Sequence, residues 1–161
     1  MNSDLIHPDI VLRSLRRHQD PQLRAAAICD IAARQTRSPL AAYYSTYKQT
    51  VKQRNLRRLG LTSHIGFIRL PESLAMESEV FDVITLGEKA AVRNSEEGPF
   101  EEIILQSTMR SGMAVLIDEG KGLSGVLIVN HNAPFHYTGD YIRVFEQLAQ
   151  LACCIQGGVD G

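Results

Sequence analysis

Apolar residues recur at helical spacing near both ends of the chain. In residues 6–18 they fall three or four positions apart, which predicts a short first helix. Asp20 followed by Pro21 is typical of a helix start, and the apolar face beyond it predicts a second helix to about Arg37. A broader apolar face over residues 141–155 predicts a C-terminal helix that packs on a sheet.

Two pairs of apolar, β-rich runs predict strands. Residues 40–47 are rich in aromatic and β-branched side chains, and residues 56–61 form a second run after a polar segment. Residues 113–117 and 123–129 are joined by residues 118–122, a loop of hairpin length that contains two glycines. The latter pair predicts an antiparallel hairpin.

The middle of the chain has a mixed pattern. Residues 71–87 are predicted to be helical, in two short pieces, because their apolar positions recur at helical spacing and Gly87 suits a helix end. Residues 88–93 are predicted as a short strand. A turn cluster at 94–99 then leads to a further predicted helix over 100–109.

The order of these elements predicts an α+β fold with a central antiparallel β-sheet and the terminal helices on one face. Gly125 lies inside an otherwise apolar strand, and a glycine there indicates a close neighbour, for which we expect a terminal helix. No internal repeat is visible in the sequence.

Length and composition fit one domain. The chain has 161 residues, of which 44% are hydrophobic and 22% charged, as is ordinary for a globular protein. The longest uncharged stretch, residues 122–139, is interrupted by polar residues and proline, and residues 1–9 lack the order of a signal peptide. We therefore expect a cytoplasmic protein that does not cross a membrane.

Charge is distributed unevenly along the chain. Residues 1–70 carry twelve basic and four acidic side chains, whereas residues 71–161 carry five basic and fourteen acidic ones. Opposite charges can therefore meet within one fold or across a dimer. Binding of nucleic acid is an unfavoured alternative, and it would use a set of scattered basic residues: Arg13, Arg16, Arg17, Arg54, Arg57 and Arg58.

Three stretches together resemble a GAF domain, a sensory fold related to PAS domains. Residues 78–92 are similar to the helix, glycine and short strand of that family, and residues 109–117 to the entry of its fifth strand. Residues 123–129, with Asp140 beyond them, resemble its closing strand and helix start. Leu116 departs from the pattern, because the family usually has proline there.

The resemblance implies a domain organisation as well as a fold. It covers residues 20–156, which leaves residues 1–19 as an N-terminal helical extension and residues 157–161 as a flexible C-terminal tail. The GAF-like fold implies a central antiparallel sheet with the terminal helices on one face and crossover helices on the other.

The family binds its ligands between the sheet and the crossover helices, which implies a cavity bordered by residues 67–113. Arginine forks bind phosphate or carboxylate, and hydroxyl groups orient small ligands. The implied ligand-binding residues are His64, Arg69, Arg93, Ser107, Thr108, Arg110 and Ser111. The alternative for Arg110 is a surface salt bridge to Glu101, Glu102 or Asp118, and the alternative for Ser111 is a local turn cap.

The histidines offer further chemistry. His131 and His136 flank a proline-containing loop, where two imidazoles could hold a metal or act as a proton-linked switch, but no third ligand lies nearby in sequence. His64 is a pocket donor, a haem ligand or an ordinary core or surface residue. We expect no metal site, and the sequence names no cofactor.

No catalytic pattern is present in the sequence. The phosphate-binding, zinc-protease and serine-elbow motifs are absent. The GAF-fold free methionine sulfoxide reductase needs cysteines around its pocket, and no cysteine lies between Asp30 and Ala152. We interpret Cys29, Cys153 and Cys154 as small apolar fillers, with a redox contact between the terminal helices as the alternative, and we predict no enzyme activity.

The sequence therefore predicts a stand-alone GAF-like sensory or regulatory domain. It would bind a small molecule, a partner protein in trans, or both, and signal through terminal helices that also form a homodimer. The alternative is a ligand-free scaffold of the same fold for protein interaction. A cavity filled by large side chains favours the scaffold, and the candidates for filling it are Phe67, Leu74, Met76, Phe81 and Met109.

Overall fold

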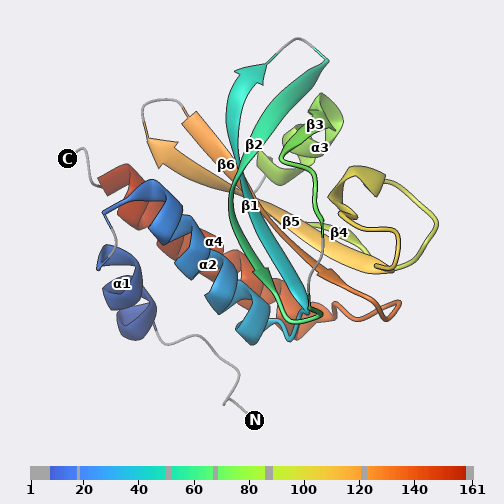
Figure 1. The fold of residues 1–161 in the computed structure, drawn as a ribbon, viewed down its shortest axis with the longest axis horizontal. Coiled ribbons are helices and arrows are strands. Elements are labelled where there is room, and N and C mark those ends of the chain that lie inside the picture. The colour runs from blue at the N-terminus through green and yellow to red at the C-terminus, as the bar shows by residue number, and fades with distance from the viewer. Residues whose placement is uncertain are drawn as a thin grey trace.

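The computed structural model describes residues 8–17, 19–49, 52–66, 69–85, 89–120 and 123–158 (Figure 1). The helices are α1 (Pro8–Arg16), α2 (Pro21–Gln35), α3 (Ser78–Thr85), the single 3₁₀ turn η1 (Glu101–Ile103) and α4 (Gly139–Gly158). The strands are β1 (Leu40–Gln49), β2 (Gln53–Ser63), β3 (Ser73–Glu77), β4 (Ala91–Arg93), β5 (Ser111–Gly120) and β6 (Leu123–His131).

The strands form one six-stranded sheet in the order β3-β2-β1-β6-β5-β4. Every neighbouring pair is antiparallel. The β1–β2 pair and the predicted β5–β6 hairpin flank the central β1–β6 pairing. This arrangement confirms the predicted α+β class with a central antiparallel sheet.

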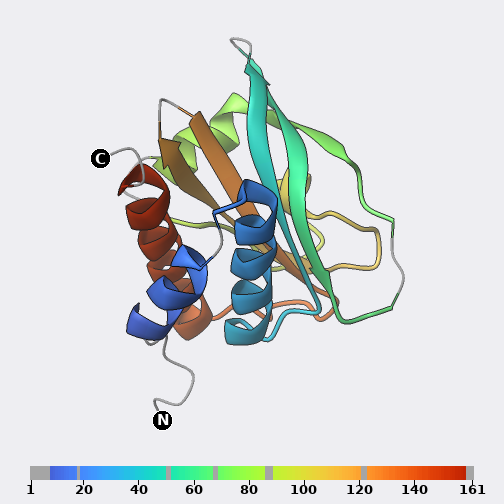
Figure 2. The ribbon, with the colours of Figure 1, turned by 60° about the vertical axis from the view of Figure 1, so that its left-hand side comes forward.

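Helices α2 and α4 cover one face of the sheet, and α1 packs on these two helices (Figure 2). Strand side chains such as Tyr43, Val115 and Leu127 form a buried core with Ile28 of α2 and Phe145 of α4. The start of α2 is as predicted: the Asp20 side chain accepts a hydrogen bond from the Gln22 amide at 2.8 Å. Within the described residues, no helix has the length and apolar character needed to cross a membrane.

A second core lies on the opposite face. There Tyr44 of β1 and Ile128 of β6 pack against Met76 of β3, Phe81 of α3 and Ile103 of η1. Side chains alternate along each strand, so residues 41 and 43 enter the first core while residues 42 and 44 enter the second. The terminal helices and the crossover elements therefore lie on opposite faces, as predicted.

The prediction of helix over residues 71–87 is wrong in its first part. Residues 73–77 form strand β3, in which Leu56 of β2 faces Leu74 and Arg54 faces Met76. Met76 is buried between two exposed neighbours, which is the period-two alternation of a half-buried strand. As a strand, residues 73–77 form backbone hydrogen bonds with the edge of β2, which a local helix would leave unpaired, so the strand is favoured over the helix.

The helix predicted over residues 100–109 shrinks to the single turn of η1. The cause is Asn130, a buried residue of β6. Its side-chain amide donates to the Ile103 carbonyl at 2.8 Å and accepts from the Leu105 amide at 2.7 Å. These backbone groups are satisfied by a side chain from another strand, and the residues that follow form a loop with a turn at Gln106–Met109 in place of a helix.

Gly125 has a close neighbour, but it is not the terminal helix we expected. A Cβ atom at this position would lie 2.3 Å from Tyr43 Oη and 2.5 Å from Tyr43 Cζ. The phenol of the neighbouring strand therefore lies across the space that a side chain would fill.

Candidate ligand groove

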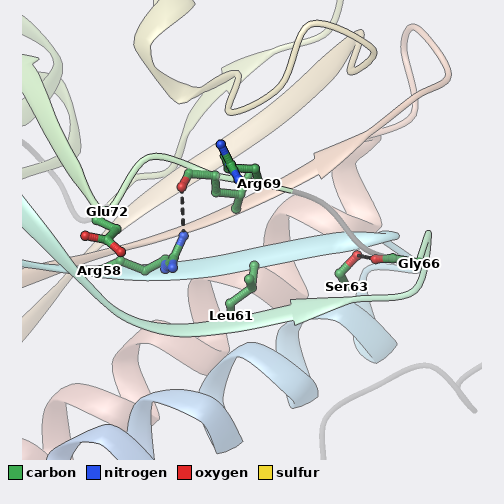
Figure 3. A pocket seen from close by; sticks show the side chains of 7 residues that line it. Arg58, Leu61, Ser63, Gly66, Arg69 and Glu72 are labelled. Carbon is green, nitrogen blue, oxygen red and sulfur yellow. Dashed lines mark hydrogen bonds between the residues drawn. The ribbon is translucent and has the colours of Figure 1, made fainter.

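A groove opens on the sheet face opposite the terminal helices, between β2 and residues 69–72, which we call the covering segment (Figure 3). Its volume is about 670 Å³, enough for a small ligand. The lining residues are Arg58, Leu61, Ser63, Gly66, Arg69, Leu70 and Glu72. We call it the β2 groove.

Arg58 holds the covering segment over the strand. Its Nη1 donates to the Leu70 carbonyl at 3.0 Å, a bond drawn in Figure 3, and its backbone amide donates to the Glu72 carbonyl at 2.9 Å. The Tyr44 hydroxyl donates to the Pro71 carbonyl at 2.8 Å. Burial raises the pKa of Tyr44 to about 12, against the opposing effect of Arg58, so this phenol stays a neutral donor.

The other end of the groove is a tight turn. The Ser63 hydroxyl donates to the Gly66 carbonyl at 3.2 Å, and Gly66 adopts a φ of +84°, which glycine tolerates at no steric cost. His64 lies in this turn with an exposed side chain, and its backbone amide donates to the Pro39 carbonyl at 2.8 Å. The imidazole of His64 is not part of the groove lining.

The groove combines two guanidinium groups, one carboxylate and two leucines. Figure 3 shows Arg58 beneath the covering segment and Arg69 projecting from that segment. Planar guanidinium groups bind carboxylate and phosphate oxygens, while Leu61 and Leu70 offer apolar surface. This donor set suits a small organic anion.

Comparison with solved structures identifies the architecture. No protein-family model and no curated protein sequence matches the chain. A protein from Burkholderia vietnamiensis described as a GAF sensor superposes with a TM-score of 0.67 at 12% identity, over 95% of this chain and 86% of that one. The chain therefore has a GAF fold.

Two further structures with this fold bind small molecules. The chromophore-binding domain of the R. palustris bacteriophytochrome RpBphP3 gives a TM-score of 0.69 at 13% identity, and 95% of this chain matches 61% of that one. Free methionine-R-sulfoxide reductase from Neisseria meningitidis, in complex with its substrate, gives 0.68 at 11% identity, over 91% of this chain and 83% of that one. One of these GAF-fold proteins is thus an enzyme.

Only Arg69 of the implied ligand-binding residues lines the β2 groove of this GAF fold. Arg93 instead donates hydrogen bonds to the carbonyls of Ser95, Glu96 and Gly98, which fixes the loop after β4. Ser107 and Thr108 are exposed on the following segment.

Arg110 and Ser111 also make contacts within the fold. The Arg110 guanidinium pairs with Glu96 at 2.6 Å, a different acidic partner from the three expected, and donates to the Ser107 carbonyl. The Ser111 hydroxyl donates to the Ala133 carbonyl at 2.8 Å. The structure therefore separates these residues from the groove.

The sequence patterns do not predict most of the groove. They place Arg58 only among the scattered basic residues, and they assign no role to Ser63 or Glu72. One signal was available: Arg58 stands two positions after the core residue Leu56, so strand alternation directs both toward the same face.

The centre of the crossover face is filled by side chains. Met76, Phe81 and Met109 are buried there, and Leu74 packs against them. Phe67, the fifth residue named for this role, lies outside the described residues. Leu70 belongs to this core and Leu61 packs against it, so the β2 groove lies at the edge of the core.

His131 and His136 stack face to face, with ring centroids 3.7 Å apart. His131 Nδ1 accepts from the Ala133 amide at 2.9 Å, and His136 Nε2 donates to the Thr36 carbonyl at 2.9 Å. In the part of the chain that is described, no three His, Cys, Asp or Glu side chains gather as metal ligands. Burial and the neighbouring His136 lower the pKa of His131, which favours a neutral imidazole.

Cys29 and Cys153 lie in different surroundings. Cys29 is buried in the helix-side core, and burial raises its pKa well above the usual range, so its thiol is unreactive. Cys153 Sγ accepts from the Asp118 amide at 3.2 Å. The side chain of Cys154 lies outside the described residues.

The basic residues considered for nucleic acid lie in two groups. Arg13 and Arg16 of α1 and Arg17 directly after it are exposed. On β2, Arg54 lies over the Phe81 ring at 4.8 Å and Arg57 over the Tyr47 ring at 4.6 Å. Figure 2 shows α1 and the start of β2 at distant parts of the molecule.

Proposed function

We propose that this GAF domain is a sensory or regulatory module that binds a small organic anion in the β2 groove. The observation that carries the proposal is the Arg58 guanidinium within the groove, held against the segment that covers it. Support also comes from the fold, because two structures similar to this chain bind a chromophore or a substrate.

The chemistry of the groove defines the class of ligand. The guanidinium of Arg58 has three nitrogen atoms. Nη1 donates hydrogen bonds to the Leu70 and Pro71 carbonyls. Arg69 adds a second, exposed guanidinium on the covering segment. A carboxylate or phosphate with a small apolar body matches this donor set.

A ligand in the groove would act on the terminal helices through β2. Gly60 lies between the groove-lining residues Arg58 and Leu61, and a Cβ there would lie 2.8 Å from the backbone carbon of Ala25 in α2. The backbone of α2 therefore rests directly on the strand, with no side chain to absorb a displacement. Binding that shifts β2 would move α2 with it.

Differential scanning fluorimetry against a panel of small carboxylates and phosphates tests the ligand proposal. At least one compound should raise the melting temperature. For the Arg69→Met variant, the concentration of that compound needed for the same rise should be at least ten times higher. Arg143→Met is the matched control, because Arg143 is exposed, pairs with Asp140 and is absent from the groove lining. Equal losses for both variants would refute the groove as the site.

We further propose a homodimer through the terminal helices, with a partner protein in trans as the receiver of the signal. Ile10 of α1 and Leu23 of α2 are 63% and 55% exposed, and they offer apolar surface on the outer helical layer. Light scattering at micromolar concentration should show a dimer that Ile10→Asp and Leu23→Asp together convert to a monomer. A wild-type monomer would contradict this assembly.

A ligand-free scaffold is the second candidate function. The observation in its favour is the core of Met76, Phe81 and Met109, which fills the centre of the crossover face. In that case no compound would shift the melting temperature, while the protein would still bind its partner.

A further inference from the structure

Phe135 combines an unusual backbone conformation with high exposure. Its φ is +56°, a region that bulky residues rarely adopt, and 69% of the residue is exposed. Its backbone amide donates to the Asn94 carbonyl at 2.6 Å. The loop therefore holds a large aromatic side chain out in solvent at a cost in backbone energy.

Contacts from three separate segments hold this loop in place. The Asn94 side chain accepts from the Tyr137 amide at 3.2 Å and donates to the Tyr137 carbonyl at 3.0 Å. Ser111 of β5 donates to the Ala133 carbonyl at 2.8 Å, and His136 contacts the Thr36 carbonyl at 2.9 Å. Strained residues persist where their surroundings over-determine them, and they concentrate at functional sites.

The loop after β4 begins at Asn94, whose carbonyl accepts the hydrogen bond from the Phe135 amide, and it carries Glu96 and Glu97. The loops after β4 and β6 lie at the same end of the sheet (Figure 1). The Arg93 guanidinium fixes the loop after β4 by its bonds to backbone carbonyls, and Glu96 is neutralised by Arg110. Glu97 on this loop and Glu101 at the start of η1, which follows it, are both exposed.

We propose that Phe135, Glu97 and Glu101 form a docking surface for a partner protein. The partner presents an apolar pocket for the Phe135 ring, bordered by lysine or arginine side chains that face the two carboxylates. Charge complementarity selects this partner, because an acidic protein or a nucleic acid would meet like charge at this surface. A rigid, exposed aromatic side chain is a typical centre for such an interface.

The surface is separate from the β2 groove, and none of its three residues lines that groove. It lies directly before α4, one of the helices proposed to carry the signal. Docking here is therefore independent of ligand binding and holds for the sensory and the scaffold function alike.

Site-specific photocrosslinking identifies the partner. A benzophenone amino acid replaces Phe135 in cells that naturally make the protein, and the same amino acid at Val83 is the control, since Val83 is 40% exposed on α3 and belongs to neither proposed interface. We expect one defined protein crosslinked from position 135 and not from position 83, with the contact in a basic, apolar surface. No crosslink from position 135, equal yields from both positions, or a crosslink to a second copy of this chain would overturn the proposal.

Binding of the purified partner then tests each residue. Phe135→Asn and Glu97→Lys should each weaken binding at least tenfold, and the contribution of Glu97 should shrink as salt rises. Asparagine tolerates positive φ, so Phe135→Asn should melt no lower than the wild type. Val83→Ala should bind like the wild type, and a partner that binds Phe135→Asn with unchanged affinity would refute the docking surface.

Discussion

Gly125→Ala tests the packing between β6 and β1. The new Cβ would lie 2.3 Å from Tyr43 Oη, so the methyl group and the phenol must separate by roughly 1 Å to reach van der Waals contact. Tyr43 is buried and its hydroxyl donates to Glu119 at 2.8 Å, while Ser45 donates to the same carboxylate at 2.6 Å. The phenol therefore moves only by giving up this bond.

The magnitude follows from two costs and one gain. Overpacking a close contact costs about 1–3 kcal/mol. A hydrogen bond to a charged group contributes about 1.5–3 kcal/mol, and the bond from Tyr43 to Glu119 lies at the low end because it is only partly buried. Replacing glycine in a strand recovers about 0.5–1 kcal/mol. The net loss of unfolding free energy is about 2–4 kcal/mol, or roughly 5–15 °C in melting temperature.

Urea denaturation measures this loss as a lower midpoint at unchanged m value. Gly139→Ala is the control, because a Cβ at Gly139 has no atom within 4 Å, and its effect should stay within about 0.5 kcal/mol. Combined with Tyr43→Phe, the cost of Gly125→Ala should fall by about 1 kcal/mol or more, since the contacting hydroxyl is gone. Strictly additive effects would refute the assignment of the strain to Tyr43.

Three further predictions concern stability. Asn130→Ala leaves the buried backbone groups of residues 103 and 105 without partners, so urea denaturation should show a loss of about 2–4 kcal/mol. Asp20→Ala removes the cap of α2 and should cost about 1 kcal/mol by the same assay. The lowered pKa of His131 means that the unfolded chain binds more protons just below pH 7, so stability should fall as pH drops through about 6.5 toward the folded pKa. His131→Asn, which keeps an acceptor for the Ala133 amide, should flatten that fall in thermal melts from pH 7 to 5, and an unchanged slope would contradict the assignment.

The fold was largely predictable where local patterns and tertiary packing agree. Asp20 and Pro21 began α2 as expected, and the apolar runs at 113–117 and 123–129 became the β5–β6 hairpin. The GAF-like order of elements needed only these local signals and their spacing.

Prediction failed where a distant residue decides the local structure. Residues 73–77 are a strand because the edge of β2 is available to pair with them. Residues 104–109 are not helical because Asn130, from a later strand, takes the backbone groups of residues 103 and 105. Neither contact has a signal within the segment that it controls.

The candidate site was predictable only in part. Arg69, one of the residues named from the family resemblance, lines the groove, and its role in ligand binding stays a prediction, whereas Arg93 and Arg110 bind backbone and acidic groups of their own loop. A sequence shows that a guanidinium is present, but its partners depend on how the loop after β4 closes. The position of Arg58 also depends on tertiary structure, because only the pairing of β2 in the sheet places its side chain under the covering segment.

Native mass spectrometry of the protein as purified, followed by denaturation of the same sample, tests the central claim most directly. We predict a dimer that releases a defined small molecule carrying a carboxylate or phosphate, and a much lower yield of that molecule from the Arg69→Met variant than from Arg143→Met. A chain that carries no small molecule from its native cells, and to which none binds when carboxylates and phosphates are added, would contradict the account of the β2 groove as a sensory site.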